Sequence, residues 1–250
     1  MKRTIKELKG FTINAKDGTK GTVKDFLFDE ESWTIRYMVA DLGNFLPGRK
    51  VLIPRVFLED TDWVKGTFSV ALSKDQIKNC PELTEHKPVS REYETKLYDH
   101  YDLEYYWPVA YSAPLGTSAT LTPPNPVHLN LDIIKDDDIE SNLRSFNEVK
   151  GYHLECLDKK KGHLKNFIID DESWQIAYMV VDIGHWYTRS KKVMLSAEWM
   201  HTINYIDQTI HVDLNSETLE NAPEFDPSQP VNVKYEQQIF DYYGRRTVNA

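Results

Sequence analysis

Carboxylates are the residues best suited to acid–base chemistry in this chain, and several recur at matching positions of two similar stretches. These pairs are Asp29 and Asp170, Glu31 and Glu172, and Asp41 and Asp182. A general acid or base needs a partner group in a desolvated pocket. The first two pairs lie in turns instead, and the third lies two residues before a glycine, where turn geometry selects aspartate. We therefore predict that these carboxylates shape turns and that the chain is not an enzyme and has no catalytic residue.

The histidines and cysteines give no metal-binding pattern. No two of the eight histidines have the helical spacing of a zinc protease site. His153 and His163 can meet across a hairpin, but two histidines without a third ligand make a poor site. Cys80 and Cys156 are matched by alanine in the other stretch, which indicates small buried positions. We expect no metal, no cofactor and no disulfide framework.

Two loops combine an aromatic residue with a basic one, a pairing enriched at protein interfaces. The first loop has Phe45 and Arg49, and the second has Trp186 and Arg189. These four are the candidate partner-binding residues. The alternatives are packing between the two halves of the chain and loop drift without function.

A duplication of domain size positions these residues. Trp33 matches Trp174 at an offset of 141 residues, and Val51 matches Val193 at an offset of 142. Bulky residues alternate from each tryptophan onward, which is typical of a β-strand with one buried face, so we predict that each tryptophan begins a strand. Further short stretches bounded by turn residues predict a small barrel or sandwich. We expect each copy to fold independently around its own tryptophan-bearing strand.

Each copy ends in two short helices. Ser73 and Gln76 form a predicted capping box for a helix that ends before Pro81, and its counterpart spans 215–221. The second helix follows Ser90 in one copy and Asn232 in the other. Its apolar stripe packs either on its own barrel or between the copies. The candidates for packing between domains are Tyr93, Leu97, Tyr101, Trp107, Tyr235, Ile239 and Tyr243.

The segment between the copies is rich in proline and acidic residues, which predicts an extended linker. Its aromatic opening, residues 105–107, is too apolar for a free tether, and we expect it to dock on a barrel. The predicted domains are therefore residues 1–101 and 144–250, joined by a linker over 102–143.

Composition narrows the class of protein. The net charge is -9 and no basic cluster is present outside a turn at Lys159–Lys161, so we expect no nucleic-acid partner. No apolar run approaches the ~20 residues that span a bilayer, and charges interrupt the N-terminal apolar residues, unlike in a signal peptide. We expect a cytoplasmic protein.

The recurring segments resemble the PRC-barrel family, named after the cytoplasmic part of the photosynthetic reaction-centre H subunit. They are VKDFLFDEESWTIRYMVADLG (Val23–Gly43) and LKNFIIDDESWQIAYMVVDIG (Leu164–Gly184), followed by GRKVLIP and KKVMLS. The arrangement is similar to bacterial proteins with two such domains in tandem. The resemblance implies a mainly β protein with two small, partly open barrels, each followed by short α-helices, that serves as an adaptor or assembly surface.

The functional expectation is a non-enzymatic module that binds a protein partner or associates with itself as a homo-oligomer. The rival from another class is a small-molecule- or metal-binding protein, or an enzyme, that uses a cleft between the barrels. A third alternative is a soluble accessory of a photosynthetic electron-transfer complex, which rests on the resemblance alone.

Overall fold

The computed structural model describes residues 1–43, 48–83, 89–107, 142–184, 190–229 and 231–244. Contacts divide the chain into one compact unit made of Met1–Leu83 with Asn142–Ala250, and a second unit, Thr84–Ser141. Both copies of the duplicated sequence thus contribute to the first unit. The domain limits predicted after residues 101 and 143 stay predictions.

The first unit is built from two seven-stranded sheets of the same order, so the mainly β class is confirmed. One sheet runs β5-β4-β3-β2-β7-β6 and the other β12-β11-β10-β9-β14-β13, with one further strand on each. The strands of the first are β2 (Thr12–Ala15), β3 (Gly18–Asp29), β4 (Thr34–Asp41), β5 (Lys50–Pro54), β6 (Leu58–Asp62) and β7 (Thr67–Val70). Those of the second are β9 (His153–Glu155), β10 (Lys160–Asp170), β11 (Ile176–Asp182), β12 (Lys192–Ser196), β13 (Met200–Asn204) and β14 (Thr209–Val212).

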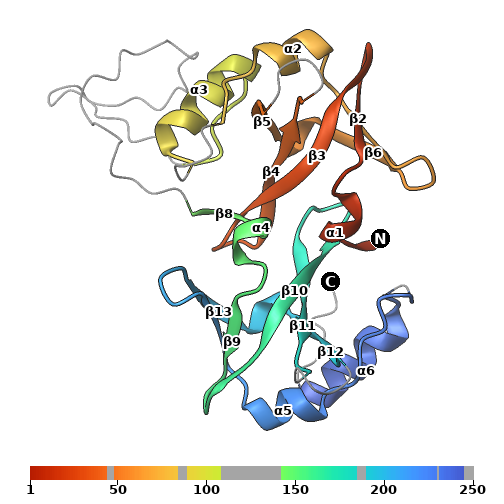
Figure 1. Ribbon diagram of the computed structural model, residues 1–250, viewed down its shortest axis with the longest axis vertical. Helices are drawn as coiled ribbons and strands as arrows, with labels where there is room; N and C mark the ends of the chain where they lie inside the picture. Colours follow the sequence, from red (N-terminus) through yellow and green to blue (C-terminus); the bar gives the residue numbers. More distant parts are fainter. Residues whose placement is uncertain (44–47, 84–88, 108–141, 185–189, 230, 245–250) are drawn as a thin grey trace, which may run out of the picture. The chain divides into compact units, whose positions relative to one another are not determined.

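The seventh strand of each sheet comes from the other copy. Strand β1 (Lys2–Thr4) pairs antiparallel with β10, and β8 (Leu143–Ser145) pairs antiparallel with β3. A one-turn helix follows each exchanged strand: α1 (Ile5–Leu8) lies against β10, and α4 (Phe146–Val149) lies against β3 (Figure 1). The exchange is reciprocal, because Lys2 and Leu143 occupy matching positions and so do their partners Asp170 and Asp29.

Trp33 and Trp174 are turn residues, which corrects the prediction that each begins a strand. Both adopt the left-handed conformation, with φ of 51° and 60°, and β4 begins one residue later, at Thr34. This conformation is costly for a residue with a β-carbon, by about 1–2 kcal/mol. The strand that follows is also buried on both faces, not on one, from Tyr37 to Ala40. The alternating bulky residues therefore belong to a strand that is buried on both faces.

The turn conformation directs each tryptophan towards the other copy. The Trp174 ring lies 6.0 Å from Phe26 and 5.7 Å from Phe68, both in the first sheet. The Trp33 ring lies 6.3 Å from Phe167 in the second sheet, besides its contact with a phenylalanine of its own copy. The expectation that each copy folds independently around its own tryptophan is therefore wrong. Each sheet uses a strand and an aromatic ring supplied by the other.

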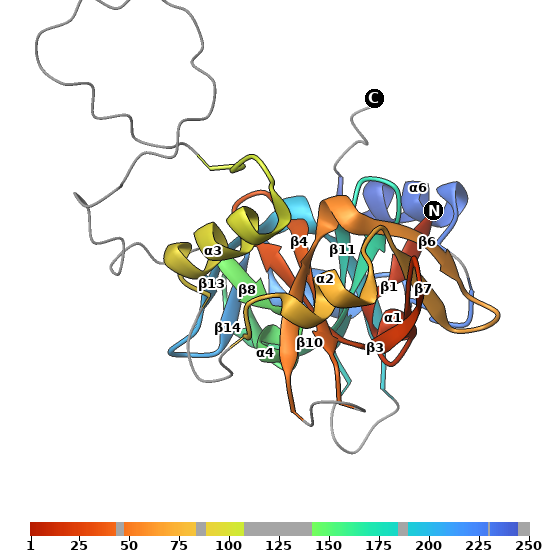
Figure 2. The same cartoon turned by 90° about the horizontal axis from the view of Figure 1, so that it is seen from above.

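The helices follow the predicted pattern. The capping box of α2 (Lys74–Asn79) forms between Ser73 and Gln76, and α5 (Ser216–Asn221) occupies the matching position. Ser90 and Asn232 accept hydrogen bonds as the N-caps of α3 (Arg91–Tyr101) and α6 (Val233–Tyr243). Helix α6 lies beside β11 (Figures 1 and 2). The short 3-10 turns η1 (Arg55–Phe57) and η3 (Ala197–Trp199) follow β5 and β12 along the chain.

The interlocked core predicts a shared unfolding transition. Trp174→Ala removes a buried ring that contacts the opposite sheet, and large-to-small changes of this kind cost about 3–5 kcal/mol. Urea unfolding with native-state hydrogen exchange should show that amides of both β3 and β10 lose protection together. Val64→Ala, at an exposed position, is the control and should shift stability by less than about 0.5 kcal/mol. Loss of protection in β10 alone would contradict the shared core.

Candidate functional site: a groove between the two copies

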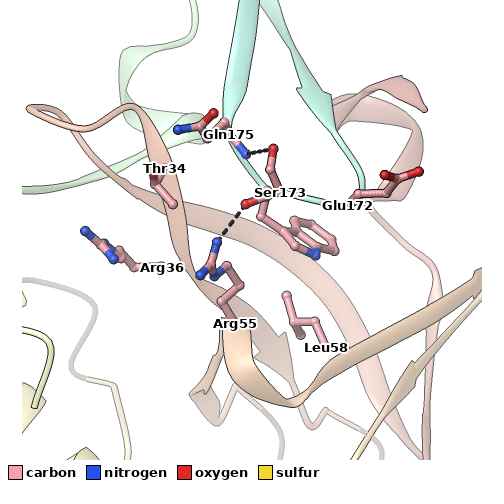
Figure 3. A pocket seen from close by; sticks show the side chains of 8 residues that line it. Thr34, Arg36, Arg55, Leu58, Glu172, Ser173 and Gln175 are labelled. Carbon is pink, nitrogen blue, oxygen red and sulfur yellow. Dashed lines mark hydrogen bonds between the residues drawn. The ribbon is translucent and has the colours of Figure 1, made fainter. Parts of the chain in front are cut away.

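An open groove of about 630 Å³ lies where the two copies meet within the first unit (Figure 3). One wall comes from β4, η1 and β6, and the other from the turn between β10 and β11. The lining residues are Thr34, Arg36, Arg55, Leu58, Glu172, Ser173, Trp174 and Gln175. The groove is open to solvent, and polar atoms make up most of its exposed lining.

Backbone hydrogen bonds between the copies fix the groove. The amide of Ile35 donates to the carbonyl of Trp174 at 2.9 Å, and the amide of Ile176 donates to the carbonyl of Trp33 at 2.7 Å. These two bonds flank an antiparallel bridge between Thr34 and Gln175. The groove walls therefore belong to a single hydrogen-bonded unit and not to two separately moving bodies.

Two arginines give the groove its polar character. Arg55 Nη1 donates to the carbonyl oxygen of Ser173 at 2.7 Å, which joins the two walls (Figure 3). Arg36 Nη2 lies 3.2 Å from Asp29 Oδ2 and 3.4 Å from Ser32 Oγ. Burial alone raises the pKa of Asp29, but the amide of Ser32 and the Arg36 guanidinium outweigh it and hold the pKa below its usual value. Asp29 is therefore a carboxylate at neutral pH.

The arginines are absent from the matching positions of the second copy. Arg36 corresponds to Ala177 and Arg55 corresponds to Ala197, although both copies form the same strands and 3-10 turn there. Asp170, which corresponds to Asp29, keeps its turn contacts without an arginine. The arginine contacts are therefore specific to the first copy, and the second copy forms the same elements with alanine at both positions.

Three of the four predicted partner-binding residues, Phe45, Trp186 and Arg189, lie outside the described residues. Arg49 is described and is half-buried. Its Nη2 donates to the carbonyl oxygen of Cys80 at 2.6 Å, which ties the start of β5 to the end of α2. A role for these four in binding stays a prediction, and the structure gives Arg49 a local structural contact.

The predicted packing residues of α6 contact their own copy. Tyr243 lies 4.5 Å from the Trp199 ring, Tyr235 lies 6.0 Å from Phe225, and Ile239 is buried. These contacts support packing on the copy to which the helix belongs. A role in packing between domains stays a prediction.

The other predicted packing residues, on α3 and just after it, belong to the second unit. Leu97 and Tyr101 are buried there and Tyr93 is half-buried. Trp107 packs on the same helix, 5.0 Å from Tyr98 and 4.5 Å from the Arg91 guanidinium. The aromatic opening of the predicted linker thus packs against α3, where a barrel was expected.

The carboxylate pairs act in turns, as predicted. Asp29 accepts hydrogen bonds from the amides of Glu31 and Ser32, and Asp170 accepts the matching pair. Asp41 and Asp182 each accept the amide of the glycine two residues later at 3.0 Å.

Cysteines and histidines also lie where the sequence indicated. Cys80 and Cys156 are buried, as are the alanines that match them. His153 and His163 are register partners in the β9–β10 hairpin, with ring centres 6.3 Å apart. Across the described part of the chain, no three His, Cys, Asp or Glu side chains converge as a metal site would require.

Sequence reasoning missed the role of Asp25. This buried carboxylate accepts hydrogen bonds from Ser145 Oγ at 2.5 Å and from the amide of Asn147 at 3.2 Å, so it fastens the exchanged strand and the start of α4. The matching residue, Asn166, accepts the amide of Lys6 at 3.2 Å. The sequence does contain a signal for this role, because a polar residue, Asp or Asn, occurs at the same position of an otherwise apolar strand in both copies.

Taken together, the fold and groove define a duplicated mainly β protein whose two sheets exchange strands. No described helix is long and apolar enough to cross a bilayer. Residues 2–77, which lie in the first copy, match the PRC-barrel domain. The chain is also 33% identical over 72 residues to an uncharacterized protein of Deinococcus radiodurans, a match that covers 29% of this chain and 26% of that protein. The chain therefore spans about a quarter of the length of this relative.

Replacing Asp25 should alter the pH dependence of stability in a defined direction. Burial raises the pKa of the Asp25 carboxyl, so its ionised form destabilises the fold relative to its protonated form. This cost is absent below the unfolded pKa of 3.8 and fully present once the pH exceeds the raised folded pKa. Asp25→Asn introduces the neutral amide that Asn166 carries at the matching position. The free energy of unfolding of the variant, measured with urea and taken relative to wild type, should therefore be higher at pH 7 than at pH 4.

The control for this measurement is Asp62→Asn, at an exposed turn carboxylate whose pKa is lowered by hydrogen bonds from Lys65. The difference in unfolding free energy between Asp62→Asn and wild type should have the opposite pH dependence. The lowered pKa of Asp62 gives the wild type stability that is lost as the pH falls. A pH-independent difference for Asp25→Asn would contradict the assignment of a raised pKa.

Proposed function

We propose that this protein is a non-enzymatic assembly module that binds a protein partner through the tips of two equivalent hairpins, one in each copy. The observation that carries the proposal is a matched pair of exposed aliphatic residues. Val64, in the β6–β7 turn, is 98% exposed, and Ile206, at the matching position of the β13–β14 turn, is 94% exposed. Single exposed apolar residues are common, but here the same chemistry recurs at the same place in both copies.

Each tip is held rigid by local hydrogen bonds. Asp62 accepts the amides of Val64 and Lys65 at 3.1 and 3.0 Å, and Asn204 accepts the amide of Asp207 at 2.9 Å. A rigid apolar residue loses little conformational freedom on binding, which favours affinity. The turns therefore present these side chains in a preorganised way.

An arginine of each exchanged strand contacts the aromatic residue that precedes the exposed residue at each tip. The Arg3 guanidinium lies 4.5 Å from the Trp63 ring, and the Arg144 guanidinium lies 4.2 Å from the ring of Tyr205. Trp63 and Tyr205 immediately precede the exposed residues. Arg144 also forms an ion pair with Glu30 at 2.8 Å. Each tip is thus linked to one of the exchanged strands.

The remaining parts of this proposal concern the domain organisation, the location and the biological context of the protein. The matching sheet order supports a second PRC-barrel domain over the second copy, in tandem with the first. A mean hydropathy of -0.55 is typical of a protein that works in an aqueous compartment, and the cytoplasm is the compartment we propose. A soluble accessory of a photosynthetic complex is a narrower version that only the family resemblance supports.

Placing a charge at both tips should abolish association. For the full chain carrying Val64→Asp and Ile206→Asp, recovery of cross-linked partners, or self-association in sedimentation velocity, should fall by about tenfold or more, because a carboxylate would be desolvated in an apolar contact. Leu157→Asp, at another turn position that is 67% exposed, should leave it unchanged. Equal recovery from the tip variant and the control would refute the proposed surface.

A further inference from the structure

We propose that one face of the second sheet binds a divalent transition-metal ion such as Zn²⁺ through four side chains, those of His153, His163, His211 and Glu155. The pairing of the strands places these side chains on neighbouring positions of one surface. The site uses none of the exposed tip residues, so it stands apart from the proposed function.

Strand pairing is the first argument. His153 in β9 is the register partner of His163 in β10, and these two strands lie side by side (Figure 1). Glu155, two residues further along β9, is the register partner of His211 in β14. Side chains two residues apart on a strand point to the same face of a sheet. Strand β9 is therefore the middle of a patch to which each neighbouring strand contributes one histidine. The expectation of no metal site considered the histidines without this parallel pairing of β9 and β14, which the sequence does not reveal.

The contacts of the side chains are the second argument. His211 Nε2 lies 3.4 Å from Glu155 Oε2, and the rings of His153 and His163 have their centres 6.3 Å apart. His153 Nδ1 lies 3.2 Å from the carbonyl oxygen of Gly162. A carbonyl can only accept a hydrogen bond, so Nδ1 carries a proton and the neutral ring presents the lone pair of Nε2. Histidines that bind metals are typically oriented in this way by a hydrogen bond from the other ring nitrogen.

Metal binding requires the two pairs of side chains to approach each other by rotation. In the described part of the chain no three of these groups converge. All four are partly or fully exposed, and exposed side chains change rotamer within picoseconds to nanoseconds. Two nitrogens that share a zinc ion lie ~3–4 Å apart, because each Zn–N bond is ~2.0–2.1 Å long. Neighbouring strands are ~4.8 Å apart, so their side chains can reach this separation.

The internal duplication is the third argument. In the first copy, Thr12 and Thr22 are register partners at the positions of the first histidine pair. Asn14 and Ser69 are register partners at the positions of the Glu–His pair. The strands pair in the same order in both copies. All four positions thus change in the same direction, from a hydroxyl or amide to an imidazole or carboxylate. Imidazole and carboxylate groups are ligands of Zn²⁺ and similar ions, so the joint change supports a shared ligand.

The test is isothermal titration of the untagged full chain with Zn²⁺ in a buffer that does not chelate metals. We expect saturable binding of one ion per chain to wild type and no binding of Mg²⁺, which prefers oxygen ligands. The double variant His153→Thr, His163→Thr reproduces the residue pair of the first copy, so it should fold and keep its urea midpoint. Zn²⁺ affinity of this variant should fall at least tenfold, because losing a ligand costs no less than losing one of its hydrogen-bond partners, which is worth ~10–100-fold.

Two single variants complete the test. His211→Ser reproduces the serine of the first copy and should also weaken Zn²⁺ binding. His201→Ala is the matched control, because His201 is an exposed histidine of the same sheet that lies 3.8 Å from a different carboxylate, that of Asp213. Its Zn²⁺ affinity should equal that of wild type. The proposed site would be overturned by absence of saturable Zn²⁺ binding, by unchanged affinity in the double variant or in His211→Ser, or by equal weakening in His201→Ala.

Discussion

The reciprocal exchange of β1 and β8 is the constraint on which the rest of the structure depends. Each exchanged strand has only three residues, too few to be stable on its own, yet each is the added edge of the opposite sheet. Inserting Trp174 against Phe26 and Phe68 adds a large buried aromatic surface. That burial offsets the ~1–2 kcal/mol cost of the left-handed turn. Neither copy has a complete core without the other.

This interlock separates positions that the fold fixes from positions that are free to diverge. Positions that hold the exchange recur in both copies: the two tryptophans, the turn aspartates, and the Asp or Asn that accepts an amide from the exchanged segment. Arg36 and Arg55 have no counterpart, although they lie among residues that do. Comparing the copies therefore separates contacts that both copies share from contacts that only one copy makes, such as those of Arg36 and Arg55.

The duplication, the helices and their caps could be predicted from the sequence, because these features are local or repeat in register. The strand exchange could not, since Lys2–Thr4 is too short to carry a periodic pattern and its partner is more than 160 residues away. The alternating pattern that begins at Trp33 is compatible with this residue in a strand or in a turn, because the sequence does not reveal its φ angle. The groove could not be predicted from the sequence either, because its lining comes from four separate elements of the two copies.

A shared core also bears on how this protein would act as an assembly module. Two binding elements on independently moving domains sample many separations, so the second contact gains little from the first. When hydrogen bonds between the copies join Ile35 to Trp174 and Ile176 to Trp33, the elements they carry keep one relative position. A partner that matches that spacing then meets the second tip at a high effective concentration. Rigidity between the copies, and not the strength of either contact alone, is what would make a duplicated domain more selective than a single one.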